Sequence, residues 1–353
     1  MSSIQSRINT FAELGKFLNQ FSRKRVKKED GVLNNEIFFD GFQHQMKLAT
    51  ENNAWFTKDN ILFSLESWAK ALTKENLQKW VSSEVIQENS SKKVAIIMAG
   101  NIPLVGFHDF LSVLISGHAV LVKQSSNDLH LLPFLAKYLE YVDESLKGKI
   151  TFTEEKLEGY DAVIATGSNN TARYFDYYFK DKPNIIRKNR NSIAVIQGNE
   201  SEQDFENLSE DVFRYFGLGC RSVSKLFVPR GFNFDLFFTG MYKQHSIINN
   251  AKYANNYDYN KTVYLMSEFD ILENGFLMIK EDESYSSPIA SIFYEYYDNP
   301  VDLKIKIHQE AENIQCIVAN DFIENEINFG QTQQPELWDY ADGVNTLAFL
   351  STI

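Results

Sequence analysis

Between residues 94 and 198 the chain repeats one pattern: a short apolar run ends at a glycine or polar residue, and an amphipathic stretch follows. Such runs are too short for buried helices and are typical of strands that are covered on both faces. Strands that alternate with helices in this way predict a parallel sheet with helices on either side, an α/β fold. We expect the strands at residues 94–98, 118–122, 161–165 and 193–196.

Helix signals lie between these strands. Pro103 is placed to open a helix that Gly117 ends, because a proline in the first turn loses no hydrogen bond. Asp128 can cap a second helix that runs to Tyr141, and a third helix is expected over residues 170–179. Ligands of such sheets bind beyond the carboxyl ends of the strands. The segments in that position are Gly100-Asn101, Lys123-Gln124-Ser125 and Thr166-Gly167-Ser168.

The chain has 353 residues, which is too long for one ordinary core and predicts two lobes. Residues 1–90 show helical spacing of apolar residues. After the first sheet we expect a helix over residues 203–215 and a strand over residues 224–228. The remaining expected elements are strands at residues 262–266, 276–279, 290–296 and 316–318 and a helix over residues 302–312.

Composition excludes several classes of function. With 35 basic and 47 acidic residues the net charge is −12, which argues against binding to nucleic acid. Polar residues interrupt the most apolar region, residues 94–122, so no membrane span is expected. The six histidines lack metal-ligand spacing, so no metal site is expected. Two separated cysteines and a polar start without a secretory signal predict a cytoplasmic protein.

Cys220 is the residue most suggestive of chemistry. It lies in Phe216-Gly-Leu-Gly-Cys-Arg-Ser222, between an expected helix and an expected strand. A thiol among glycines, where backbone amides can approach a substrate, suggests a nucleophile, and a structural thiol is the alternative. Cys316 lies in the interior of an expected strand and is interpreted as a core residue.

Four segments, in this order along the chain, resemble the aldehyde dehydrogenase superfamily. They are similar to its Asn-Phe-Pro-type loop, its cofactor segment, its Thr-Gly-Ser turn and its nucleophile segment: Asn101-Ile-Pro-Leu, Ala119-Val-Leu-Val-Lys123-Gln-Ser, Ala165-Thr-Gly-Ser168 and Gly219-Cys220-Arg-Ser. Within the superfamily the chain is most similar to the LuxC-type fatty acyl-CoA reductases, in its short length and in residues 330–350.

The resemblance implies two lobes, each with an open, mainly parallel sheet flanked by helices. It implies a helical N-terminal region plus nicotinamide-cofactor-binding domain over residues 1–198 and a catalytic domain over residues 199–325. Residues 326–353 are expected to pack back on the body as a C-terminal segment. A homo-oligomer is also expected.

The resemblance further implies the reduction of an acyl-CoA, or another acyl thioester, to an aldehyde, with NADPH as reductant and NADH as the alternative. A long acyl chain and a partner protein that transfers the acyl group are compatible with it. Catalysis would fall to Cys220 as nucleophile and Asn101 as oxyanion donor. The residues implied in cofactor binding are Lys123, Ser125, Thr166, Gly167 and Ser168.

Two departures from the superfamily pattern affect the predicted reaction and the predicted cofactor contacts. The glutamate that activates water in hydrolytic members is missing from Arg187-Lys-Asn-Arg-Asn191, so a thiol becomes the natural acyl acceptor or donor. Glu283 is offset from the position of the glutamate that contacts the nicotinamide ribose. An acylating aldehyde dehydrogenase, an acyl-phosphate reductase and a non-catalytic cofactor-binding subunit remain as alternatives.

Overall fold

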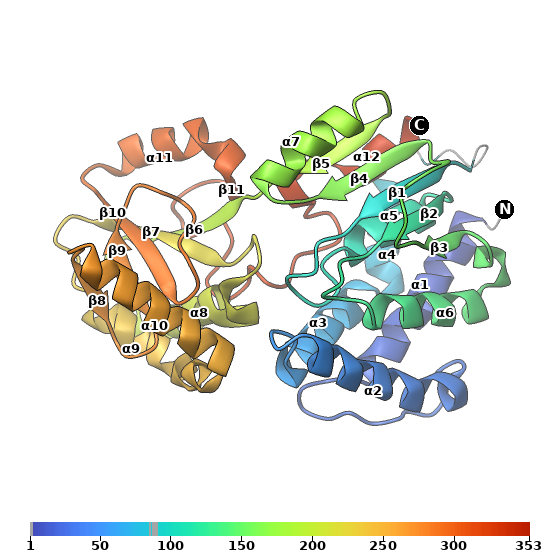
Figure 1. The fold of residues 1–353 in the computed structure, drawn as a ribbon, viewed down its shortest axis with the longest axis horizontal. Helices are drawn as coiled ribbons and strands as arrows, with labels where there is room; N and C mark the ends of the chain where they lie inside the picture. The colour runs from blue at the N-terminus through green and yellow to red at the C-terminus, as the bar shows by residue number, and fades with distance from the viewer. Residues whose placement is uncertain (1–2, 85, 87–90) are drawn as a thin grey trace. The chain divides into compact units, whose positions relative to one another are not determined.

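The computed structural model describes residues 3–84, 86 and 91–353. It divides into two compact units (Figure 1). Unit 1 comprises Met1–Lys188 and Glu336–Ile353, and unit 2 comprises Asn189–Pro335. No helix in the described ranges is both long and apolar enough to cross a membrane.

Unit 1 contains a five-stranded sheet in which every pairing is parallel. The central strand, β1, pairs with β2 on one side and β4 on the other, so the order is β3-β2-β1-β4-β5. The sequence predicted the three inner strands but missed both edge strands, of which β3 has three residues. The bounds are β1 Lys93–Ile97, β2 Ala119–Lys123, β3 Ile150–Phe152, β4 Ala162–Thr166 and β5 Asn184–Arg187.

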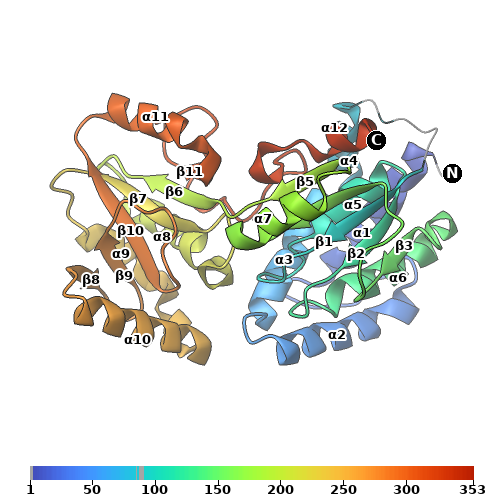
Figure 2. The same ribbon diagram turned by 45° about the horizontal axis from the view of Figure 1, so that its top comes forward.

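Helices cover both faces of this sheet, as the near-continuous apolar strands predicted (Figure 2). Val94 and Ile96 face the core formed with the N-terminal helices, α5 and α6, whereas Ala95 faces a smaller cluster with Phe175 of α7. The helices are α1 Ile4–Asn19, α2 Asn35–Asn52, α3 Lys58–Ala71, α4 Lys74–Ser82, α5 Phe107–Ile115, α6 Leu131–Val142, η1 Glu144–Leu146 and α7 Asn169–Tyr178.

Two predicted helix starts were wrong. Pro103 lies in a turn, and α5 begins only at Phe107, because Leu104 adopts a left-handed conformation with φ of 59°. Asp128 does not cap α6, which begins at Leu131. Its carboxylate instead accepts a hydrogen bond from the Leu104 backbone N–H at 3.0 Å. Gly117, with φ of 91°, follows the end of α5 as predicted.

Unit 2 contains a six-stranded sheet of order β11-β6-β7-β10-β9-β8. It is parallel except for the antiparallel pair of β8 and β9 at one edge. The strand predicted at residues 193–196, within the predicted first domain of residues 1–198, is β6, and it pairs with β7 and β11 of unit 2. The bounds are β6 Asn191–Val195, β7 Val223–Pro229, β8 Ile271–Glu273, β9 Met278–Glu281, β10 Ser291–Tyr297 and β11 Ile314–Val318.

One predicted strand of unit 2, residues 262–266, is the last part of helix α10. Tyr253, Tyr257, Asn260 and Tyr264 recur at helical spacing and form its buried face, which outweighs the β-propensity of the Thr-Val-Tyr segment. The helices of unit 2 are α8 Glu202–Phe213, η2 Arg214–Gly217, α9 Asp235–Met241, η3 Tyr242–Asn249, α10 Ala251–Met266, α11 Pro300–Gln309 and η4 Ala311–Asn313.

The C-terminal segment is divided between the units. Residues up to Pro335 belong to unit 2, whereas Glu336–Ile353, with η5 Ala341–Gly343 and α12 Thr346–Ser351, belongs to unit 1. Side chains of unit 1 bind the backbone carbonyls of this returning segment. His108 Nε2 lies 2.9 Å from the Leu337 oxygen, and His118 Nε2 lies 3.1 Å from the Leu350 oxygen.

Arg187, at the end of β5, makes the strongest of these attachments. Its guanidinium forms a buried two-point ion pair with Asp109 of α5, at 2.6 and 3.2 Å. It also donates to the Ala341 carbonyl at 2.7 Å and to the Thr346 hydroxyl at 3.0 Å. One side chain therefore joins the sheet, α5 and the C-terminal segment.

Replacing Arg187 with methionine leaves the Asp109 carboxylate buried without its guanidinium, and we expect a loss of about 3–5 kcal/mol in the free energy of unfolding. Urea titration followed by circular dichroism measures this change. Arg230→Met is the matched control, because Arg230 holds Asp298 in the same way but both side chains are exposed. Equal losses in the two variants would contradict the assignment.

Candidate active site

Cys220 lies in an exposed turn between η2 and β7 of unit 2. The turn follows an unusual run of backbone: Tyr215, Phe216 and Gly217 are all left-handed, with φ of 56°, 60° and 74°. Left-handed conformations cost a non-glycine residue about 1 kcal/mol or more and concentrate at functional sites. The Tyr215 and Phe216 side chains are buried, and this burial offsets the strain. We call residues 215–222 the nucleophile turn, after the role that the sequence predicts for Cys220.

Several side chains of unit 2 hold the nucleophile turn in place. The Ser192 hydroxyl, on β6, donates to the Cys220 carbonyl at 2.9 Å. Gln333 donates to the Ser222 hydroxyl at 3.3 Å, and Arg221 donates to the Thr332 carbonyl. The turn is thus fixed from both the neighbouring strand and the segment around residue 332.

A buried carboxylate completes this support. Asp211 on α8 accepts hydrogen bonds from the Gly330 N–H at 2.6 Å and from the Thr332 N–H and hydroxyl at 2.9 and 2.8 Å. Burial raises the pKa of Asp211 to about 6, although these hydrogen bonds act in the opposite direction. The helix before the nucleophile turn and the segment that supports it are therefore tied together.

The strand that leaves the nucleophile turn also fixes a loop. Lys225 of β7 is fully buried, and its ammonium donates to the Asp282 carbonyl and contacts Glu295 at 3.2 Å. Burial lowers the pKa of Lys225, while Glu295 opposes that effect. The Ser224 hydroxyl donates to the Tyr285 carbonyl at 2.7 Å. Glu283 lies exposed on this anchored loop.

In unit 1 the three polar segments predicted at strand ends lie along one edge of the sheet. Ile97, the last residue of β1, pairs with Lys123 of β2 and with Ala165 of β4. The structure thus brings the Gly100-Asn101, Lys123-Ser125 and Thr166-Ser168 segments to adjacent strand ends. We call this the strand-end edge of unit 1.

Each segment of the strand-end edge has a defined local role. Lys123 donates from its ammonium to the Glu155 carbonyl at 3.0 Å. The Ser125 side chain lies so close to Gly100 that a Cβ added there would fall 2.6 Å from its hydroxyl. Only glycine therefore allows the loop that follows β1, including the half-buried Asn101, to lie against the loop that follows β2.

The segment after β4 starts a helix. Thr166 ends the strand, and the Gly167 N–H donates to the Arg187 carbonyl at 3.3 Å. A Cβ at Gly167 would lie 3.0 Å from Thr171 and Phe175, so glycine permits close packing against α7. The Ser168 hydroxyl caps α7 by accepting the Thr171 N–H at 3.3 Å.

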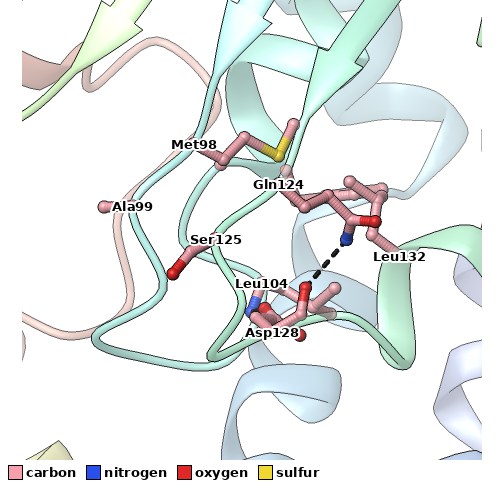
Figure 3. Close-up of a pocket in the computed structure, with 9 residues that line it drawn as sticks. Met98, Ala99, Leu104, Gln124, Ser125, Asp128 and Leu132 are labelled. Atoms are coloured by element: carbon pink, nitrogen blue, oxygen red, sulfur yellow. Dashed lines mark hydrogen bonds between the residues drawn. The ribbon is translucent and has the colours of Figure 1, made fainter. Parts of the chain in front are cut away.

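Sequence reasoning missed the residues that support these segments. Gln124 and Asp128 line a small pocket behind the strand-end edge together with Met98, Leu104 and Leu132 (Figure 3). Asp211 and Thr332, which support the nucleophile turn, are far apart in the sequence. No local signal marks Asp128, which lies in a largely polar stretch, residues 123–130. Among the described residues, no group of three or more His, Cys, Asp or Glu side chains is placed to hold a metal ion.

The fold is similar to that of solved aldehyde dehydrogenases. The aldehyde dehydrogenase KauB from Pseudomonas aeruginosa matches with a TM-score of 0.64 and 11% identity, over 90% of this chain and 72% of that one. The NAD+ complex of an aldehyde dehydrogenase from Bacillus cereus matches with a TM-score of 0.61 and 13% identity, over 92% and 72% of the two chains. Both predicted features of the fold, the two sheets and their flanking helices, are confirmed.

The sequence places the chain more narrowly. The family model described as Acyl-CoA reductase (LuxC) matches residues 37–236, which is more than half of the chain. The protein therefore belongs to the LuxC acyl-CoA reductase family, as the resemblance predicted. The long-chain acyl-protein thioester reductase of Aliivibrio fischeri is 22% identical over 240 residues, which are 61% of this chain and 48% of that relative. The aligned region thus spans about half the length of the curated relative.

The raised pKa of Asp211 predicts a pH-dependent stability. The native state binds a proton on the Asp211 carboxylate more tightly than the unfolded chain does. The protonated carboxyl therefore stabilises the native state below about pH 4, and this contribution to the free energy of unfolding is lost as the pH rises through about 6. Relative to Asp211→Asn, the wild-type free energy of unfolding should fall by about 3 kcal/mol over this range.

Urea titrations at a series of pH values measure the difference in the free energy of unfolding between wild type and Asp211→Asn. The titration of all other groups contributes equally to both proteins and cancels in this difference. Asp298→Asn is the control, because a hydrogen bond from Arg230 holds the pKa of that exposed carboxyl below its ordinary value. Its difference from wild type should stay flat above about pH 5. A flat difference for Asp211→Asn as well would contradict the prediction.

Proposed function

We propose that this protein reduces an acyl thioester to an aldehyde through an acyl group bound to Cys220. The observation that carries the proposal is an exposed cysteine in a strained, multiply braced turn, within an aldehyde-dehydrogenase fold. Membership of the LuxC family and the name of the curated relative support a thioester as substrate. The substrate we favour is a long-chain acyl-CoA or another acyl thioester.

Cys220 attacks the thioester carbonyl as a thiolate, a bond from its sulfur to the acyl carbon forms, and the carrier leaves as a thiol. We assign stabilisation of the developing oxyanion to the Asn101 side-chain amide and the Cys220 backbone N–H. The loss of one such donor typically costs about 3 kcal/mol of barrier. The position of the backbone N–H depends on the nucleophile turn, which Ser192 fixes through the Cys220 carbonyl.

A nicotinamide cofactor fits the strand-end edge by the chemistry of its groups. Lys123 and Ser125 supply an ammonium and a hydroxyl where parallel sheets bind ligands, and we assign them to the adenosine ribose or its phosphate. Thr166, Gly167 and Ser168 are assigned to packing against the cofactor. When bound, NADPH, or NADH as the alternative, supplies the hydride that reduces the acyl group.

The segment before β6 supports reduction over hydrolysis. It contains no carboxylate between Arg187 and Asn191, and Arg187 is bound to Asp109 in the core of unit 1. This segment therefore supplies no base to activate water against an acyl-enzyme. We further propose a cytoplasmic homo-oligomer that can receive its acyl group from a partner protein.

Incubation with a long-chain acyl-CoA, in the absence of nicotinamide, should add one acyl group to the protein, as measured by intact mass. Cys220→Ala should abolish the adduct, whereas Cys316→Ala, which removes the buried cysteine of β11, should retain it. NADPH should discharge the wild-type adduct as aldehyde. Reaction with acyl phosphate alone would favour an acyl-phosphate reductase, and no adduct with any acyl donor would favour a non-catalytic role.

Lys123→Met should weaken NADPH binding roughly tenfold or more, because a hydrogen bond to a charged group contributes about 1.5–3 kcal/mol. Fluorescence titration measures the affinity, and Cys220 acylation should be unchanged. Lys149→Met is the control. The Lys149 ammonium also donates to a backbone carbonyl, that of Gly117 at 3.1 Å, but Lys149 lies just before β3, at the end of the sheet where the parallel strands begin. Equal weakening in both variants would overturn the assignment of Lys123.

A further inference from the structure

The loop that carries Asn101 is held at four points within unit 1. Gly100 lies against Ser125, and a Cβ at Gly106 would fall 2.6 Å from the Met98 side chain. The Ser64 hydroxyl donates to the Pro103 carbonyl at 3.1 Å, and the Leu104 N–H donates to Asp128 at 3.0 Å. Along the chain, Asn101 lies between the contact at Gly100 and the hydrogen bonds at Pro103 and Leu104.

The Asp128 attachment differs from the others in kind. It binds Leu104, a buried residue in the left-handed conformation with φ of 59°, which costs a non-glycine side chain about 1 kcal/mol or more. A hydrogen bond from the strained residue to a carboxylate is stronger than one to a neutral oxygen and can offset that cost. Figure 3 shows Asp128 beside Leu104 at the base of the pocket, with Gln124 donating to the Asp128 backbone carbonyl.

The burial of the Asp128 carboxylate at this position lowers the stability of the fold. Asp128 is 8% exposed, and no donor among the described residues reaches its second oxygen, Oδ1. Burial raises the pKa of the carboxyl to about 6, which records the cost of the ionised form. The pocket that Asp128 lines is mostly apolar, with Gln124 and Ser125 as its other polar side chains, and an apolar side chain in place of Asp128 would avoid the cost of burying a carboxylate. A group that costs stability while imposing a strained backbone is typical of a functional constraint.

We propose that Asp128 is a positioning residue for the reaction: by holding Leu104, it sets the conformation of the loop that presents Asn101. This inference rests on the proposed function of Asn101 as an oxyanion donor. Asp128 itself touches no reacting atom. Its loss should therefore slow the acylation of Cys220 only through Asn101.

A double-mutant cycle tests this dependence. Asp128→Ala should slow the acylation of Cys220 by an acyl-CoA up to about 100-fold, the effect of an ångström-scale misplacement, with little change in the acyl-CoA concentration for half-maximal rate. In an Asn101→Ala background the same substitution should cost less than about twofold. A full effect in both backgrounds would show a role independent of Asn101 and overturn the proposal.

Two further variants separate positioning from general loosening. Asp128→Asn keeps an oxygen that can accept the Leu104 N–H, and it should retain acylation within about threefold of wild type. Asn52→Ala removes a hydrogen bond from α2 to the Ser126 carbonyl, in the same loop as Asp128, and should leave acylation unchanged. A defect in Asn52→Ala equal to that in Asp128→Ala would overturn the proposal.

Amide hydrogen exchange reads the loop without any reaction. Asp128→Ala should speed the exchange of residues 99–106, above all of Leu104, while Asp128→Asn should not. Unchanged exchange in Asp128→Ala would overturn the inference even if acylation fell. If wild-type protein formed no acyl-enzyme, the proposed function would fail by itself, and the exchange would still decide whether Asp128 sets the loop.

Discussion

The buried ion pair between Arg187 and Asp109 fixes the limits of unit 1. Arg187 ends β5, so the guanidinium stands where the chain leaves the first sheet, and its further bonds to Ala341 and Thr346 hold the segment that returns to that unit. A two-point guanidinium–carboxylate pair is directional, so it selects one arrangement of the three segments. The edge of the sheet therefore rests on this charge pair, and the Arg187 carbonyl accepts the N–H of Gly167, a residue of the predicted cofactor site.

Buried charge is used in the same way elsewhere. Asp128 binds the backbone of Leu104, Asp211 binds Gly330 and Thr332, and Lys225 binds the Asp282 carbonyl. Each of these groups costs stability by its burial, as the raised or lowered pKa of each records. Each is bonded to the backbone of an irregular segment: Asp128 holds the loop that carries Asn101, and Asp211 holds the segment to which Arg221, beside Cys220, donates. Such segments lack a ladder of hydrogen bonds, so a charged side chain is an effective way to give them one conformation.

The regular parts of this fold could be predicted from the sequence because their signals are local. Strands β1, β2 and β4 are short apolar runs buried on both faces, and the polar residues after them lie at one edge because parallel strands share their direction. Strand β5 was not predicted because it ends in Arg187, whose ion-pair partner, Asp109, lies 78 residues earlier in the chain. Asp128 was mistaken for a helix cap, since its partner, Leu104, can be identified only once the two loops are adjacent. The glycine-rich setting singled out Cys220, and the strand pattern singled out the strand-end residues. Their roles were implied by the resemblance and remain predictions.

The same long-range contacts bear on why the acyl group would go to hydride and not to water. In the segment that matches the water-activating region of hydrolytic relatives, the only buried charge, Arg187, is a cation that is already bound to Asp109. A guanidinium stays protonated at any physiological pH and so cannot serve as a base. This segment would therefore supply no base for hydrolysis of the acyl-enzyme that we propose on Cys220. A cysteine in a turn that is held by hydrogen bonds, without a base from this segment, suits the transfer of an acyl group from one sulfur to another, followed by reduction.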